Sequence, residues 1–289
     1  MDSVMHKLPW GVNALVKCIQ CHEVPGKYRL YEATKLSCSH KLITYHIEGA
    51  EFSIPWDQWC FWKNYGPENY YLDEIVPFTE VLNKQLAMFD FFDLGADVGV
   101  VSALINKYCS RLSTIYAFEP NPVSFSVLRG NLANISSRHF SCNLGVSDFS
   151  GQCKFVFNND LGSDHEGHLV KEEDGQTKVV ALDAFIAEHA IKIQEDIAIK
   201  VDVEGQEVPA LNGAKHLIES ANKVVLLLEL HPEVLEREKQ TPEDLFTTAE
   251  GIRDFQWLVP LEGNKKVDRS TSFFSQFKHQ QYDVIGIAG

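Results

Sequence analysis

Short apolar runs alternate with amphipathic stretches from Phe89 to the end of the chain. Near-continuous apolar runs of this length are typical of strands buried on both faces, and the stretches between them have helical spacing. The expected strands are residues 88–94, 114–118, 139–144, 197–202, 223–230, 256–259 and 282–288. The expected helices are residues 98–107, 123–134, 182–189, 208–220 and 242–252. This order predicts an α/β fold, a doubly wound and mostly parallel sheet of these seven strands with helices on both faces.

The first 85 residues have a different character, and we expect an N-terminal mixed β and aromatic extension (1–85) before the main domain (86–289). Residues 27–33 and 41–48 alternate like the two strands of a hairpin. An aromatic cluster follows, made of Phe52, Trp56, Trp59, Phe61, Trp62, Tyr65, Tyr70 and Tyr71. This cluster either packs the extension against the sheet or another subunit, or offers a stacking surface to a sugar ring. The extension would then cover the substrate or serve in oligomerisation.

Two segments fall outside the alternation of strands and helices. Residues 152–157 have the pattern of an extra edge strand, and residues 158–177 are polar and contain several glycines. A polar segment of this length is either a mobile lid on the substrate side or an ordinary surface loop.

Composition narrows the class of protein. The chain has 289 residues and a formal net charge of −14, which argues against nucleic acid as a partner because phosphate binding needs clustered Lys and Arg. Its seven cysteines are odd in number and dispersed, which suggests reduced thiols and a cytoplasmic location. We see no secretory signal and no apolar run of about 18 residues, so no membrane-spanning helix is expected.

The most specific chemistry lies where the first strand of the main domain ends. The residues of this turn are Asp93, Gly95, Ala96, Asp97 and Gly99. The two glycines let the backbone approach a ligand. Their spacing differs from the Gly-x-Gly-x-x-Gly of dinucleotide sites, and two carboxylates would repel a pyrophosphate. Carboxylates suit a cation, so we predict S-adenosylmethionine as the cofactor, because it carries a sulfonium and an ammonium group.

Further cofactor contacts are expected where the next two strands end. After the second strand an acid can accept both ribose hydroxyls, and the residues expected there are Glu119, Pro120 and Asn121. After the third strand we expect an adenine-binding wall made of Asn143, Val146, Ser147 and Asp148. A simple turn without a ligand is the alternative at this third place.

Ionisable residues end the fourth and fifth strands. The fourth ends with Lys200, Asp202 and Glu204, which alternation places on one side. Such groups at the end of a buried strand are costly unless they serve a ligand or form an ion pair. We expect Asp202 near the ammonium group of the cofactor, and we expect Glu204 to orient or deprotonate an acceptor hydroxyl. Glu229 and His231 end the fifth strand, and His231 is the candidate general base because imidazole suits an alcohol proton.

Metal sites are alternatives that no ligand spacing demands. A divalent ion could be held by Asp202, Glu204 and His231. Zinc-like ligand types occur at Cys18, Cys21, Cys38 and His40. We therefore predict no metal as a required cofactor.

Five motifs follow one another between Phe89 and Pro232. They are Phe92-Asp-Leu-Gly-Ala-Asp-Val-Gly99, Ala117-Phe-Glu-Pro-Asn-Pro122, Val180-Ala-Leu-Asp-Ala-Phe185, Ile199-Lys-Val-Asp-Val-Glu-Gly-Gln-Glu207 with Leu211-Asn-Gly-Ala214, and Leu228-Glu-Leu-His-Pro232. Together they resemble the FkbM-type methyltransferases. The resemblance implies a class I (Rossmann-like) fold, S-adenosylmethionine as methyl donor and transfer to an oxygen, commonly of sugars and other hydroxylated natural products. Asp97 stands where that family usually has Asn, at the contact to the methionine part of the cofactor.

These expectations give one leading function and two alternatives. The leading function is an S-adenosylmethionine-dependent O-methyltransferase that acts on a hydroxyl of a carbohydrate or another polyhydroxylated natural product. Its partner would be a small-molecule or glycan acceptor, and a homo-oligomer would fit the extension. The alternatives are an NAD-dependent oxidoreductase on a Rossmann-like sheet and a non-catalytic scaffold subunit with the methyltransferase fold.

Overall fold

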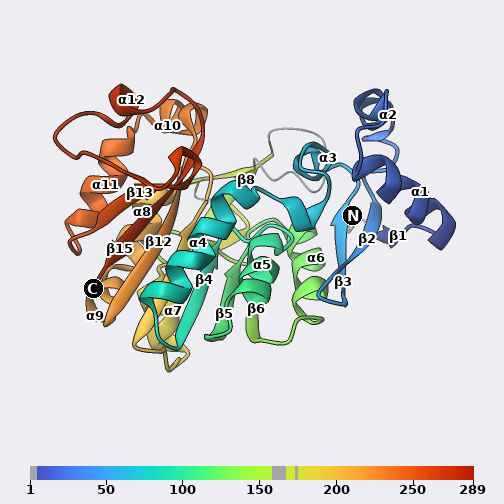
Figure 1. Cartoon of the computed structure of the whole chain (residues 1–289). Coiled ribbons are helices and arrows are strands. Elements are labelled where there is room, and N and C mark those ends of the chain that lie inside the picture. Colours follow the sequence, from blue (N-terminus) through green and yellow to red (C-terminus); the bar gives the residue numbers. More distant parts are fainter. Residues whose placement is uncertain (1–4, 158–166, 173–174) are drawn as a thin grey trace.

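The computed structural model describes residues 5–157, 167–172 and 175–289. Its main sheet consists of β4 (Phe89–Leu94), β5 (Leu112–Phe118), β6 (Arg138–Cys142), β11 (Asp196–Val201), β12 (Lys223–Leu230), β13 (Gln256–Val259), β14 (Lys265–Lys266) and β15 (Tyr282–Ala288). The strand order is β14-β13-β15-β12-β11-β4-β5-β6 (Figure 1). The five strands from β12 to β6 are parallel, and β15 is antiparallel to both β12 and β13. All seven expected strands are therefore present, and the two-residue β14 adds an eighth.

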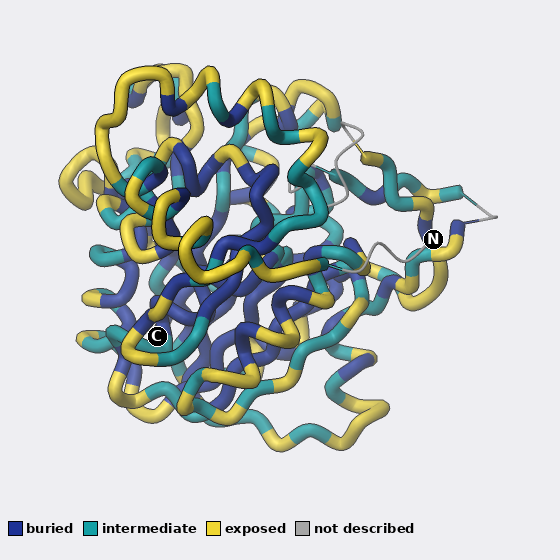
Figure 2. The backbone as a smooth tube through the Cα atoms, turned by 90° about the vertical axis from the view of Figure 1, so that its right-hand side faces the viewer, coloured by how far each residue is buried: buried dark blue, intermediate teal, exposed yellow. Residues whose placement is uncertain are grey.

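Alternate residues of the central strands face two separate hydrophobic cores. In β11, Ala198 belongs to one core, and Ile197 and Ile199 belong to the other. The first face is covered by helices that lie in front of the sheet in Figure 1, namely α4 (Leu72–Gln85), α5 (Val100–Tyr108) and α6 (Pro122–Leu132). The second face is covered by α7 (Leu182–Glu188), α8 (Glu207–Gly213), α9 (Lys215–Ser220) and α11 (Pro242–Glu250). Burial on both faces explains the continuous apolar runs, and Figure 2 shows this buried backbone in dark blue.

The helix expected at 208–220 is wrong in one respect, because the structure divides it into α8 and α9. The break lies at Ala214, whose φ is −108° and ψ is 11°. The preceding residue, Gly213, passes so close to the carbonyl oxygen of Ser147 that a Cβ there would lie 2.0 Å from it. A further helix, α10 (Pro232–Glu238), begins directly after His231 and was not expected.

In the N-terminal extension, the strand expected at 27–33 is wrong. This segment is the helix α2 (Lys27–Thr34), and both Lys27 and Tyr31 are buried, one helical turn apart. The hairpin is instead formed by β2 (Lys41–Ile47) and β3 (Ala50–Pro55). The other elements of the extension are β1 (His6–Lys7), α1 (Trp10–Gln20), α3 (Trp59–Lys63), the 3₁₀ turn η1 (Pro67–Asn69) and α4, the helix that covers the main sheet.

The extension is joined to the main domain by a buried polar pair. The backbone N–H of Ser53 in β3 donates to Asn131 Oδ1 at 2.7 Å, and Asn131 Nδ2 donates back to the Ser53 carbonyl at 2.8 Å. Asn131 belongs to α6, so the small sheet of the extension lies beside this helix (Figure 1). The aromatic cluster mostly supports this packing, because its buried members are Phe52, Trp56, Phe61 and Trp62.

A second, four-stranded sheet lies between β6 and α7 in the sequence. It consists of β7 (Gly145–Val146), β8 (Gly151–Val156), β9 (His168–Val170) and β10 (Thr177–Val180), in the order β7-β10-β8-β9. The strand expected at 152–157 is thus present as β8, but it is not an edge strand of the main sheet. Cys153, Leu169 and Val179 form a small core that holds this sheet together. Of the expected loop at 158–177, residues 158–166 and 173–174 lie outside the described residues.

The last part of the chain adds the 3₁₀ turn η2 (Pro260–Glu262) and the short helix α12 (Phe273–Gln276) before β15. Over the described ranges of the chain, no helix combines the length and the hydrophobicity that are needed to cross a membrane.

Candidate active site

A pocket of about 250 Å³ opens where β4, β5, β11 and β12 end. The strand ends contribute Gly95, Asp97, Glu119, Pro120, Asp202, Glu204, Glu229 and His231. The second, four-stranded sheet contributes Val146, Phe155, His168 and Leu169, and the extension contributes Trp59, Tyr70 and Tyr71. The pocket therefore lies at the carboxyl ends of the parallel strands, where doubly wound proteins bind their ligands.

The turn after β4 depends on backbone conformations that favour glycine. Gly95 has a φ of +77°, Gly99 has a φ of +87°, and Asp97 between them has a φ of +46°. A Cβ at Gly95 would lie 1.7 Å from the carbonyl oxygen of Asp202, because the chain leaving β4 runs directly beside the chain leaving its parallel neighbour β11. Ala96 is buried in this turn, and Gly99 precedes α5. The turn thus brings backbone to the pocket wall at a place where a side chain has no room.

Glu119 ties the turn after β4 to the turn after β5. Its Oε2 accepts the backbone N–H of Asp97 at 2.8 Å, and its Oε1 accepts the N–H of Asn121 at 2.7 Å. Burial raises the pKa of Glu119 to about 8, and the neighbouring Asp97 carboxylate adds to this shift. Asn121 itself caps α6, since its Oδ1 accepts the N–H of Val123. Glu119 thus lines the pocket while each of its two carboxyl oxygens accepts a backbone N–H.

A buried lysine holds the carboxylates under the pocket. Lys200 Nζ lies 2.7 Å from Asp202 Oδ2 and 3.7 Å from Asp93 Oδ1, and it donates to the Gly95 carbonyl at 2.9 Å. Asp93 is fully buried, accepts the hydroxyl of Ser102 at 2.6 Å and does not line the pocket. Burial raises the pKa of Asp93, and Lys200 opposes this shift. Asp93 was expected at the cofactor, but its place in the structure makes it a support of the turn.

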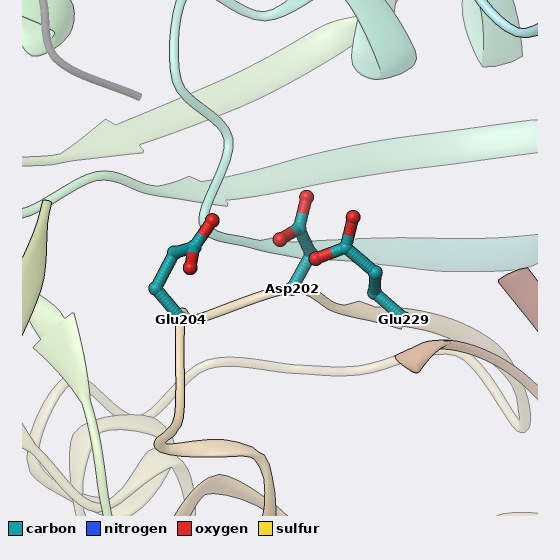
Figure 3. A group of neighbouring side chains, drawn as sticks. All are labelled: Asp202, Glu204 and Glu229. Carbon is teal, nitrogen blue, oxygen red and sulfur yellow. The ribbon is translucent and has the colours of Figure 1, made fainter. Parts of the chain in front are cut away.

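Three carboxyl groups converge on one side of the pocket. They belong to Asp202 and Glu204 after β11 and to Glu229 in β12, and each has an oxygen within 4.8 Å of the others (Figure 3). Burial raises the pKa of Glu229, and Asp202 and Glu204 raise it further. Gln281 Nε2 donates to Glu229. Oxygen ligands of this kind fit a hard divalent cation or several hydroxyl groups.

His231 also lines the pocket, two residues after Glu229 and immediately before α10. Its Nδ1 is buried and has no hydrogen-bond partner among the described residues. A buried ring nitrogen without a partner is costly in a folded protein unless a ligand supplies one. The structure therefore brings His231 into the pocket with Asp202 and Glu204, as expected from the strand ends.

The expected adenine wall is only partly at the pocket. Val146 lines it, whereas Asn143, Ser147 and Asp148 do not. Asn143 Nδ2 donates to the carbonyls of Glu119 and Pro120, so it fixes the ribose-side turn instead. The hydroxyl of Ser147 lies 3.4 Å from Gln206 Oε1 and from Asp148 Oδ1.

Comparison with known families shows the family to which the chain belongs. The model of the methyltransferase FkbM domain matches residues 93–257, from the end of β4 to β13. The chain belongs to the FkbM methyltransferase family. This membership argues against the oxidoreductase alternative. The residues matched contain every strand end that lines the pocket except the one before β15.

Individual relatives of this methyltransferase are distant. It is 28% identical over 141 residues to the hexuronic acid methyltransferase AglP of Haloferax volcanii, a match that covers 48% of this chain and 55% of AglP. The chain thus spans about half the length of this curated relative. Among solved structures, methyltransferase FkbM of Methylobacillus flagellatus is 17% identical, with 96% of this chain and 59% of that chain covered and a TM-score of 0.43. The TYW2 protein of M. jannaschii in complex with AdoMet is 12% identical, with 86% and 84% covered and a TM-score of 0.39.

The metal alternatives change with the structure. Within the described part of the methyltransferase, Asp202, Glu204 and Glu229 are the group of ligand-type side chains close enough to share an ion, so His231 is not in that set. The four zinc-like residues of the extension, Cys18, Cys21, Cys38 and His40, form no such group. Cys21 Sγ instead lies 4.0 Å from the hydroxyl of Tyr45. The sequence ranked His231 above Glu229 because it could not show which side chain faces Asp202.

Sequence reasoning also missed the walls of the pocket that come from outside the main sheet. Leu144 and Gly145, which line the pocket, fall within the stretch 143–148 expected at the adenine, whereas Phe155, Gly167, His168 and Leu169 line it without having been named as site residues. No local pattern marks them, because they reach the pocket through the pairing of β8 with β9 and β10. Trp59, Tyr70 and Tyr71 belonged to the aromatic cluster, but only their placement in the fold separates them from its buried members.

We predict that cofactor affinity rises with pH through the titration of Glu119. An ionised Glu119 accepts hydrogen bonds from the ribose hydroxyls. Its pKa of about 8 in the folded protein means that it is largely protonated at neutral pH. The dissociation constant for S-adenosylhomocysteine should fall between about pH 6 and pH 8, by at most about tenfold per pH unit. Calorimetry at several pH values measures this, and Glu119→Gln should bind weakly without that trend.

The same shift has a consequence for the stability of the ligand-free protein. Because the folded pKa of Glu119 lies above its ordinary value of 4.5, the folded state binds its proton more tightly than the unfolded state. The stabilisation is fully present below about pH 4.5 and is lost as the pH rises through about 8. A wild-type dissociation constant for S-adenosylhomocysteine that stays the same between about pH 6 and pH 8 would contradict the raised pKa of Glu119.

We predict a large stability loss when Lys200 is replaced by methionine. The substitution leaves Asp93 and Asp202 without their buried cation, and breaking a buried pair costs about 3–5 kcal/mol. Urea unfolding should show this loss. The matched control is Lys215→Met, which removes an exposed pair with Glu219 at 3.8 Å and should cost well under about 1 kcal/mol. Equal effects of both substitutions would refute the structural role of Lys200.

Proposed function

We propose that this methyltransferase transfers the methyl group of S-adenosylmethionine to a hydroxyl oxygen of a carbohydrate or another polyhydroxylated small molecule. The observation that carries this proposal is that His231 lines the same pocket as three converging carboxyl groups. The ring nitrogen Nδ1 of His231 is buried and has no partner among the described residues, so it is available to a ligand. The carboxyl oxygens beside it can accept hydrogen bonds from a methyl acceptor that presents several hydroxyl groups.

The cofactor would occupy the side of the pocket formed by Gly95, Asp97 and Glu119. Gly95 offers backbone at close range, Glu119 suits the ribose, and the acidic turn favours a cation. S-adenosylmethionine supplies an activated methyl group on a positively charged sulfur. Asp202 also lines the pocket, and its carboxylate would suit the ammonium group of the cofactor.

The acceptor would lie between the cofactor side and His231. The acceptor oxygen forms a bond to the methyl carbon, the carbon–sulfur bond breaks with its electron pair going to sulfur, and the hydroxyl proton goes to His231. Glu204 and Glu229 would accept hydrogen bonds from neighbouring hydroxyl groups and fix the orientation of the acceptor. In-line positioning of this kind supplies much of the rate acceleration of transfer reactions.

Two observations favour a carbohydrate among polyhydroxylated acceptors. The curated relative AglP is named as a hexuronic acid methyltransferase. In this chain, the extension places Trp59, Tyr70 and Tyr71 at the pocket, and Trp59 remains 38% exposed. Aromatic side chains with an exposed face suit the apolar C–H face of a sugar ring. The extension thus would cover the acceptor side, while its other aromatic residues hold it on the main domain.

The experiment is a mass-spectrometric search for products that gain one methyl group from labelled S-adenosylmethionine. Neutral methyl glycosides, hexuronic acids and polyhydroxylated small molecules serve as acceptors. We expect label in a methyl ether, which survives mild alkali. Label that mild alkali releases would show a methyl ester, hence a carboxyl acceptor, and would overturn transfer to a hydroxyl. A protein that binds the cofactor without transferring label to any class would favour the scaffold alternative.

We further predict that turnover survives treatment with EDTA. The proposal assigns hydrogen bonding to the acidic group of Asp202, Glu204 and Glu229, and it needs no cation. Turnover is measured after exhaustive chelation, with and without added Mg²⁺. Activity that is lost on chelation and restored by Mg²⁺ would instead assign these three carboxylates to a divalent ion that lowers the pKa of the acceptor hydroxyl.

A further inference from the structure

One residue of the extension reaches the cofactor turn directly. Gln58 is fully buried directly before α3, and its Nε2 lies 2.8 Å from both carboxylate oxygens of Asp97. Asp97 lies 39 residues away in the sequence, in the turn after β4. Glutamine was not among the residues expected at the site, and none of the five family motifs includes this position.

The surroundings of Asp97 explain why this contact matters. Asp97 has a φ of +46°, a conformation that few side chains adopt without support. Its backbone N–H is already donated to Glu119, so two carboxyl groups lie close together in this turn. The amide of Gln58 satisfies the Asp97 carboxylate and carries no charge of its own. A lysine or arginine at position 58 would instead place a positive charge beside a cationic ligand.

The segment that carries Gln58 is itself held in place. The hydroxyl of Tyr31 in α2 donates to the Asp57 carbonyl at 2.7 Å, and the indole N–H of Trp62 donates to the Trp56 carbonyl at 2.9 Å. Both contacts are buried. The position of Gln58 is thus set by the fold of the extension, and the residue after it, Trp59, lines the pocket.

We propose that Gln58 is a positioning residue for the methyl donor, which holds the Asp97 carboxylate in its binding orientation and makes the N-terminal extension a part of the cofactor site. This inference rests on the proposed binding of S-adenosylmethionine at the turn after β4. It predicts that changes in the extension alter the affinity for the donor, and not only the recognition of the acceptor.

The experiment measures S-adenosylhomocysteine binding by calorimetry for Gln58→Ala, Gln58→Glu, Asp97→Asn and the double variant Gln58→Glu/Asp97→Asn. Loss of a hydrogen bond to a charged group should weaken binding about 10–100-fold in Gln58→Ala. Gln58→Glu should be weaker still, because it places two carboxylates face to face. In the double variant, the amide introduced at position 97 can donate to the carboxylate introduced at position 58.

The decisive result is a change of sign. Asp97→Asn should weaken binding in the wild-type background and strengthen it in the Gln58→Glu background. A general loss of structure would not produce this reversal. The matched control is Gln20→Ala, which also removes a fully buried glutamine of the extension, but one whose side-chain amide has no hydrogen-bond partner among the described residues. It should bind S-adenosylhomocysteine like the wild type.

Two outcomes would overturn the inference. One is a Gln58→Ala protein, folded by circular dichroism, that binds within about twofold of the wild type. The other is a double variant in which Asp97→Asn weakens binding as it does alone. A wild-type protein that fails to bind S-adenosylhomocysteine would instead overturn the proposed cofactor site, so the two failures are distinct.

Discussion

Replacing His231 by alanine is expected to slow methyl transfer ~10²–10⁴-fold and to leave the binding of S-adenosylhomocysteine unchanged. His231 lines the pocket beside the acid group, and its buried Nδ1 has no hydrogen-bond partner among the described residues. The cofactor contacts proposed above come from other strand ends. The loss should therefore appear in kcat with labelled S-adenosylmethionine, once an acceptor is known, and not in the calorimetric dissociation constant.

A pH profile separates a base from a merely structural histidine. If His231 takes the hydroxyl proton, the wild-type rate should depend on pH in a way that the rate of His231→Ala does not. The matched control is His46→Ala, because His46 is exposed in β2 and does not line the pocket. An unchanged rate in His231→Ala would remove this residue from the mechanism.

Replacing Gly95 by alanine is expected to abolish detectable cofactor binding and to lower the stability of the protein strongly. The added Cβ would lie 1.7 Å from the Asp202 carbonyl oxygen, which belongs to backbone and cannot move aside as a side chain can. The φ of +77° adds strain for a residue with a Cβ. The ends of the paired strands β4 and β11 would have to move apart, and this separates the turn from Asp202. Thermal unfolding and calorimetry with S-adenosylhomocysteine measure both effects.

Gly26→Ala is the matched control for this prediction. Gly26 has a similar φ of +84°, but nothing lies within 4 Å of the position of its Cβ. Alanine there carries the conformational cost alone, about 1–2 kcal/mol, and should leave cofactor binding intact. If both variants are destabilised equally and both bind the cofactor, the close approach of Gly95 to the Asp202 carbonyl is not what the site requires.

The strands of the main domain could be predicted because each signal is local. Burial on both faces of β4, β11 and β12 needs continuous apolar runs, and such runs are visible in a single segment. The prediction of a strand at 27–33 was wrong because it, too, used only a local signal. The alternation of this segment fits a strand, but burial of Lys27 and Tyr31 one turn apart depends on the neighbours that α2 packs against.

The candidate site divides in the same way. The glycine turn after β4 and the acid after β5 were visible in the sequence, because backbone conformation and strand ends are properties of neighbouring residues. The role of Asp93 was not visible. The register of β4 and β11 pairs Asp93 with Lys200, and this pairing makes it a buried partner of a lysine and not a pocket residue.

The sequence by itself determined the methyltransferase class, the order of strands and helices in the main domain and the strand ends that carry the chemistry. Only the tertiary structure decided that Glu229 joins Asp202 and Glu204, that His231 stands outside this group, and that Gln58 reaches Asp97. The physical reason is that periodicity acts over a few residues. Convergence of side chains that are distant in the sequence depends on strand order, register and the packing of the extension, which no single segment encodes.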